Sequence, residues 1–114
     1  MSLQDLVGLP YRKGARGPLE FDCAGIVLEV MGRLGFVGVT LEPDKWREIG
    51  KEVTCARLPG DVALSRSDDE TLGVSVLVES SPPLFMTAFP DRGVSFVGAR
   101  ALSAGVVAVY RWQP

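Results

Sequence analysis

A periodic run of apolar residues between Cys23 and Leu34 constrains the fold more than any other part of the chain. Its apolar positions recur every three or four residues, which is the spacing of one face of an α-helix. They are Cys23, Ile26, Val27, Val30, Met31 and Leu34. Asp22 stands directly before the run, where an N-cap belongs, and Gly35 follows it, where a C-cap belongs. The sequence therefore predicts a buried helix whose first turn contains Cys23.

The position of Cys23 in that first turn makes it a candidate nucleophile. Backbone N–H groups and the helix dipole favour an anion at a helix N-terminus, so we expect this position to favour the thiolate. The alternative is purely structural, because cysteine is often a small buried residue and Cys23 could simply begin the helix.

Length and composition suit one compact domain, and we predict a single domain over residues 1–114. Hydrophobic residues make up 46% of the chain and charged residues 23%, which is enough for a core and typical of a globular protein. A net charge of −2 gives no basic footprint for nucleic acid. No apolar run approaches the roughly 18 residues of a membrane helix. The first five residues show neither a basic nor an apolar signal region, so we predict no signal peptide.

The chain contains no histidine and only two cysteines, Cys23 and Cys55. Two cysteines do not make a disulfide framework. Without histidine or a close cysteine pair we predict no metal site and no cofactor. Cys55 has no accompanying motif, and we interpret it as a structural residue of low reactivity.

The segment from Gly8 to Pro18 is predicted to be an ordered loop, because it holds three glycines and two prolines. It runs straight into the predicted helix, so we expect its backbone to lie over the helix N-terminus. It carries Arg12, Lys13 and Arg16. These basic residues could recognise the carboxylates of a peptide, or they could belong to a solvated loop.

A second helix is predicted from about Pro43 to Val53, with Trp46, Ile49 and Val53 on one face. The rest of the chain is rich in β-branched residues and turn signals. It predicts strands at Val62–Leu64, Gly73–Val78, Leu84–Phe89, Val94–Val97 and Val106–Trp112. Helices followed by an antiparallel meander indicate the α+β class.

Three segments resemble a known family. Leu9–Tyr11, Gly14 and Phe21–Val27 resemble the nucleophile region of NlpC-type cell-wall cysteine peptidases. Leu58–Val62 is similar to the family's Pro-Gly-Asp turn, and Tyr110–Trp112 is similar to its arginine-containing last strand. The resemblance spans nearly the whole chain. It implies a papain-like, NlpC-type α+β domain in which the cysteine helix packs on an antiparallel β-sheet.

The resemblance also implies the site residues. Cys23 occupies the nucleophile position, and Tyr11 and Asp22 are implied to bind substrate. The catalytic histidine of the family falls at Gly73, and its third polar residue falls at or near Thr87. Because the chain contains no histidine, no shift of the alignment supplies one.

Members of this family typically hydrolyse peptide stems of bacterial peptidoglycan, and many occur in phage tails. A positioned general acid–base contributes roughly 10²–10⁴-fold to such a reaction. We therefore interpret the chain as a catalytically impaired, peptidase-like domain that serves as a binding or structural module. The implied partners are peptidoglycan stem peptides or phage-tail-like assembly proteins, with no nucleic acid and no membrane. The implied location is the cytoplasm or a virion or tail.

Two alternatives remain open at the level of sequence. In the first, the domain is an active cysteine endopeptidase or amidase that uses Asp69, Glu79 or a partner's side chain as its base. In the second, the histidine was replaced by engineering, or the family match is wrong.

Overall fold

The computed structural model describes residues 3–36, 39, 50–66, 72–103 and 105–112. Its elements in chain order are η1 (Gln4–Leu6), α1 (Cys23–Arg33), β1 (Gly50–Val53), β2 (Val62–Arg66), β3 (Leu72–Ser80), β4 (Pro83–Phe89), β5 (Gly93–Gly98), α3 (Ala99–Ser103) and β6 (Val106–Trp112). Within these ranges, no helix has the length and apolar character needed to cross a membrane.

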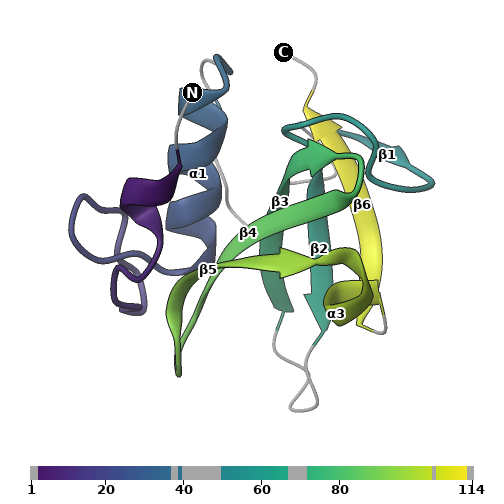
Figure 1. Cartoon of the computed structure of the whole chain (residues 1–114). Coiled ribbons are helices and arrows are strands. Elements are labelled where there is room, and N and C mark those ends of the chain that lie inside the picture. Colours follow the sequence, from purple (N-terminus) through teal and green to yellow (C-terminus); the bar gives the residue numbers. More distant parts are fainter. Residues whose placement is uncertain (1–2, 37–38, 40–49, 67–71, 104, 113–114) are drawn as a thin grey trace.

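The strands form one antiparallel sheet in the order β1-β6-β2-β3-β4-β5. Strands β2 to β5 follow one another as a meander, and β6 returns to pair between β1 and β2. Helix α1 and the N-terminal loops lie to one side of this sheet (Figure 1). The predicted α+β architecture, with the cysteine helix on an antiparallel sheet, is confirmed.

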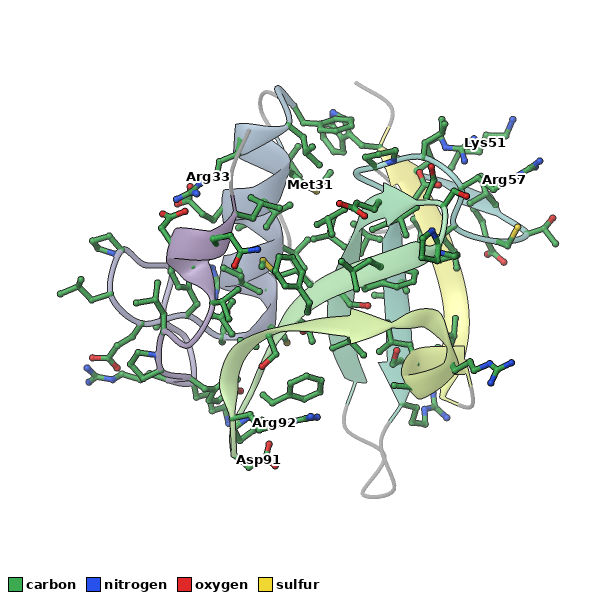
Figure 2. The ribbon with its side chains drawn as sticks, in the orientation of Figure 1. Met31, Arg33, Lys51, Arg57, Asp91 and Arg92 are labelled. Carbon is green, nitrogen blue, oxygen red and sulfur yellow. The ribbon has the colours of Figure 1, made fainter. Side chains whose placement is uncertain are left out.

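The main core lies between α1 and strands β3 and β4. The helix contributes the buried side chains of Ala24, Ile26, Val27, Val30 and Met31. Val76 and Met86 meet them from the sheet. Figure 2 shows Met31 on the side of α1 that faces the sheet, with Arg33 on the other side. Burying a side chain of this size contributes about 1.5–3 kcal/mol, so this interface fixes the position of α1.

A second, smaller core lies on the opposite face of the sheet. It is formed by Ala63, Leu77, Phe85 and Val109, with Leu102 of α3 packed against it. Neighbouring strand residues point to opposite faces, which is why Val76 belongs to the main core and Leu77 to the second.

The ends of α1 follow the capping signals. Asp22 has an extended backbone, and its side chain accepts a hydrogen bond from the Gly25 N–H. The helix ends at Arg33, with Leu34 as C-cap, and Gly35 adopts a positive φ of 98°. The predicted helix is confirmed.

The second predicted helix, Pro43–Val53, is wrong in its last four residues. Gly50–Val53 form β1, which pairs with β6 from Gly50↔Trp112 to Val53↔Val109. Four residues are too few to establish a helical period, and the backbone of β6 offers them strand pairing. Residues 43–49 of the prediction lie outside the described residues. Strands β2 to β6 are confirmed, whereas the short α3 was not predicted.

Candidate functional site

The loop before α1 lies over the N-terminus of the helix, as expected from its position in the sequence. The Asp22 N–H donates to the Ala15 carbonyl at 3.0 Å. A Cβ atom on Gly25 would overlap the Ala15 carbonyl oxygen and lie 3.2 Å from Arg16 Cα. Glycine at position 25 therefore lets the loop backbone pack directly on the first helical turn.

The Asp22 carboxylate holds the loop and the helix together. One oxygen accepts from the Gly25 N–H at 2.6 Å, and the other accepts from the Gly14 N–H at 3.1 Å. The Arg16 guanidinium donates to both oxygens at 2.7 Å. These contacts give Asp22 a structural role, and its part in substrate binding stays a prediction.

Cys23 is the first residue of α1 and is half-buried against the main core. Tyr11 is also half-buried and interacts electrostatically with Cys23. Burial raises the pKa of Tyr11, and the nearby Cys23 and Asp22 raise it further. The Tyr11 phenol is protonated at neutral pH and can donate a hydrogen bond.

The structure places Gly73 near the start of β3, directly opposite Ser65 of β2. A Cβ atom built on Gly73 meets no atom within 4 Å. The position predicted for the missing histidine thus has open space around it. It faces away from α1 and Cys23, because Gly73 alternates along β3 with Val74 and Val76 of the main core.

Thr87 lies close to Gly73. The β3–β4 pairing ends at Val76↔Met86, and beyond that pair the Thr87 hydroxyl donates to the Val74 carbonyl at 2.6 Å. That carbonyl is one residue along the chain from Gly73. Thr87 is only 5% exposed, so its hydroxyl is a buried group with a fixed partner.

The other candidate bases are poorly placed or not described. Glu79 is exposed on β3, six residues from Gly73, which corresponds to about 20 Å along a strand. Asp69 lies outside the described residues. In the described part of the chain, no group of three or more His, Cys, Asp or Glu residues could hold a metal ion.

A buried ion pair that the sequence did not predict joins two of the recognised motifs. Asp61 of the Pro-Gly-Asp turn is 1% exposed. It accepts from Arg111 Nε at 2.9 Å and Nη2 at 2.8 Å, and from the N–H groups of Arg57 and Leu58 at 2.9 and 3.0 Å. Burial opposes ionisation of Asp61, but these hydrogen bonds outweigh it and lower its pKa below the usual range. Asp61 and Arg111 are 50 residues apart in the sequence, so no local pattern predicts this ion pair.

Cys55 is a free, exposed cysteine that follows β1. It contributes nothing to the packed core, so its interpretation as a structural residue is wrong. Its predicted low reactivity stays a prediction.

No family model matches the chain, and no curated protein matches it. Solved structures do match over 96% of its length. NlpC2 from Trichomonas vaginalis superposes with a TM-score of 0.76 at 22% identity, and NlpC1 from the same organism with 0.74 at 23%. A Staphylococcus aureus protein described as similar to lipoprotein, of the NLP/P60 family, gives 0.70 at 20%. The chain covers 44%, 41% and 38% of these three chains, less than half of each.

These matches define the class of the fold. One helix on a six-stranded antiparallel sheet, with a cysteine at the helix N-terminus, is an NlpC/P60-type, papain-like arrangement. The fold implied by the sequence resemblance is confirmed.

Proposed function

We propose that this domain is a catalytically impaired, NlpC-type peptidase-like module that binds peptide without hydrolysing it. The observation that carries the proposal is the absence of histidine from the whole sequence, together with glycine at the position where the base is expected. The ligands it names are peptidoglycan stem peptides. The setting it names is the bacterial cell wall or a phage-tail-like assembly.

The polar groups at the predicted site positions support impairment because none is suited to replace an imidazole at Cys23. Thiol catalysis needs a group that takes the thiol proton and later protonates the leaving amine. The Asp22 carboxylate is occupied by Arg16 and two backbone N–H groups. The phenol of Tyr11 holds its proton too tightly to act as a base at neutral pH. The Thr87 hydroxyl donates to the Val74 carbonyl and lies on the face of the sheet away from α1, because its neighbours Met86 and Ala88 belong to the main core.

The first turn of α1 supports binding. The Gly25 N–H is capped by Asp22, and the Ile26 N–H bonds to the Asp22 carbonyl. The N–H groups of Cys23 and Ala24 have no partner within the helix, and the dipole favours negative charge there. With the Tyr11 hydroxyl, they would offer donors to a peptide carbonyl or carboxylate.

Mass spectrometry of muropeptides after incubation with the domain tests the impairment. We expect no cleavage by wild type and none by Cys23→Ala. Cleavage by wild type that disappears in Cys23→Ala would overturn the proposal and establish an active endopeptidase or amidase with an unfamiliar base.

A parallel NMR titration with the same muropeptides tests binding. We expect shifts of the amide signals of Cys23 and Ala24 and of the signals of Tyr11. Absence of any shift at millimolar muropeptide would show that these peptides are not its ligands.

A further inference from the structure

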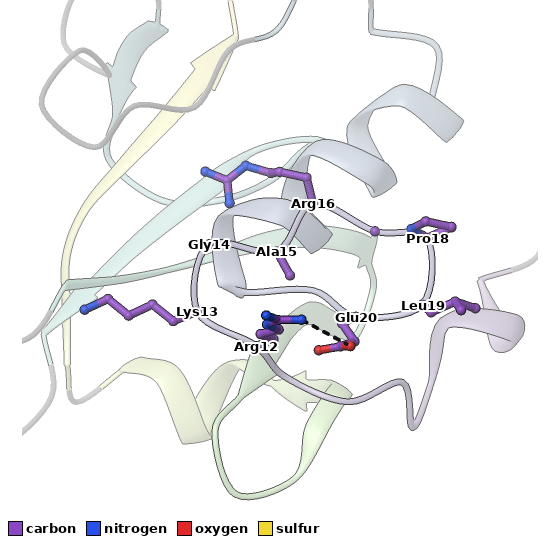
Figure 3. Close-up of a pocket in the computed structure, with 9 residues that line it drawn as sticks. Arg12, Lys13, Gly14, Ala15, Arg16, Pro18, Leu19 and Glu20 are labelled. Atoms are coloured by element: carbon purple, nitrogen blue, oxygen red, sulfur yellow. Dashed lines mark ion pairs between the residues drawn. The ribbon is translucent and has the colours of Figure 1, made fainter.

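We infer that the hollow formed by the loop 12–20 binds a carboxylate-bearing peptide with an apolar side chain. The inference rests on the proposed peptide-binding function and names the ligand chemistry of a surface beside Cys23. The hollow has a volume of about 400 Å³. It is lined by loop residues alone, among them Arg12, Lys13, Leu19 and Glu20 (Figure 3).

The backbone around this hollow is held in place before any ligand arrives. The Arg12 N–H donates to the Phe21 carbonyl at 3.2 Å, and the Ala15 N–H donates to the Arg12 carbonyl at 3.0 Å. Phe21 is 1% exposed and anchors the far end of the loop in the main core. A preformed loop lowers the ordering cost of binding, so weak charge contacts can produce measurable affinity.

The positive charges of the loop favour a ligand anion, which would compete with Glu20 for Arg12. Arg16 is already paired with Asp22. Arg12 is 3.8 Å from Glu20 in an ion pair whose side chains are 72% and 42% exposed. Such a pair is weak and exchangeable. Among the residues that the structure describes, Lys13 takes part in no ion pair, so it and Arg12 are available to a ligand carboxylate.

The apolar part of the ligand is assigned to Leu19, which is 72% exposed. Figure 3 shows Lys13 and Leu19 on opposite sides of the loop, with Arg12 and Glu20 side by side between them. A peptide across the loop would place its carboxylate at Arg12 and Lys13 and an apolar side chain on Leu19. A bare anion such as phosphate would leave Leu19 unused.

The test is an NMR titration with an N-acetylated leucyl-alanine dipeptide and with its C-terminal amide. We expect the acid to shift the amide signals of residues 12–20 and to bind at least fivefold more tightly than the amide. Arg12→Gln and Lys13→Gln should each weaken binding of the acid roughly two- to fivefold, as for exposed charge pairs. Glu20→Gln should strengthen it by a similar factor, because the competing carboxylate is gone.

Lys51→Gln is the matched control, since Lys51 is exposed on β1, away from this loop in Figure 2. It should leave the affinity unchanged. Equal binding of acid and amide, equal effects of Lys13→Gln and Lys51→Gln, or tighter binding of inorganic phosphate than of the dipeptide would each overturn the inference.

The same titration with muropeptides separates this inference from the proposed function. Muropeptides that bind near Cys23 and are unaffected by Arg12→Gln and Lys13→Gln would refute the assignment of the loop alone. If the dipeptide binds the loop and muropeptides bind nowhere, the proposed ligand class is wrong and the charge chemistry of the loop stands.

Discussion

Arg111 of the last strand donates from Nε and Nη2 to both carboxylate oxygens of Asp61, at 2.9 and 2.8 Å. The pair ties the Pro-Gly-Asp turn to β6, which also pairs with both β1 and β2. The arginine in the last strand and the aspartate in the turn, two motifs of the sequence resemblance, are therefore one structural unit. Asp61 stabilises the sheet that carries Gly73, and it is too buried to act on a ligand.

Asp61→Asn should destabilise the protein substantially. The substitution removes the charge that faces Arg111 and weakens the turn bonds from Arg57 and Leu58. Loss of charged hydrogen bonds at a buried site is worth about 2–4 kcal/mol in the free energy of unfolding. Urea denaturation followed by circular dichroism measures it. Asp5→Asn, at an exposed carboxylate paired with Arg33, is the control and should change stability far less.

The same pair predicts how stability depends on pH. The pKa of Asp61 is lower in the folded protein than in the unfolded chain, so the unfolded state binds more protons in acid. The contribution of Asp61 should be fully present above about pH 4, the ordinary pKa of aspartate. It should be lost as the pH falls through the lowered pKa. The stability difference between wild type and Asp61→Asn should therefore shrink on acidification from pH 6 to pH 2, and a constant difference would contradict the assignment.

Replacing each of two glycines of α1 by alanine should change the stability of the protein in opposite directions. Gly32→Ala should stabilise the helix by up to about 1 kcal/mol, because a Cβ atom there meets nothing within 4 Å. Gly25→Ala should cost about 1–3 kcal/mol, because its Cβ atom would overlap the Ala15 carbonyl oxygen. Thermal unfolding of the two variants against wild type measures both effects. A stabilising Gly25→Ala would show that the loop does not pack on the helix as described.

Local signals sufficed for α1. The N-cap Asp22, the apolar period and Gly35 all lie in one short stretch of the chain, so the helix could be predicted from the sequence of that stretch. The helix prediction was wrong for residues 50–53 because their conformation is set by pairing with β6, about 60 residues further along the chain. The four residues themselves carry too short a pattern to distinguish a strand from a helix.

The candidate site was predictable to a similar degree. The position of Cys23 followed from the helix start. The hydrogen bonds from Arg16 and Gly14 to Asp22 could not be predicted, because they depend on the path of the loop that joins these residues. The hydrogen bond from Thr87 to the Val74 carbonyl could not be predicted from the sequence either, since it forms where the β3–β4 pairing ends. These contacts give Asp22 and Thr87 structural roles.

Gly73→His tests whether position 73, which the resemblance implies for the catalytic histidine, can supply a base to Cys23. The variant should fold, because the space at position 73 is open and a strand glycine itself costs roughly 0.5–1 kcal/mol. Thr87 donates its proton to Val74, but its oxygen lone pairs remain able to accept from an imidazole N–H. Position 73 faces away from Cys23, however, because its neighbour Val74 belongs to the main core against α1. We therefore expect no cleavage of muropeptides by Gly73→His, measured by mass spectrometry.

The double variant Gly73→His with Cys23→Ala is the control for that experiment and should also show only the background of wild type. Gly73→Ala controls for filling the space without adding a base and should show no cleavage. If Gly73→His is folded by circular dichroism and cleaves muropeptides while the double variant does not, a side chain at position 73 reaches Cys23 and the orientation described for it is wrong.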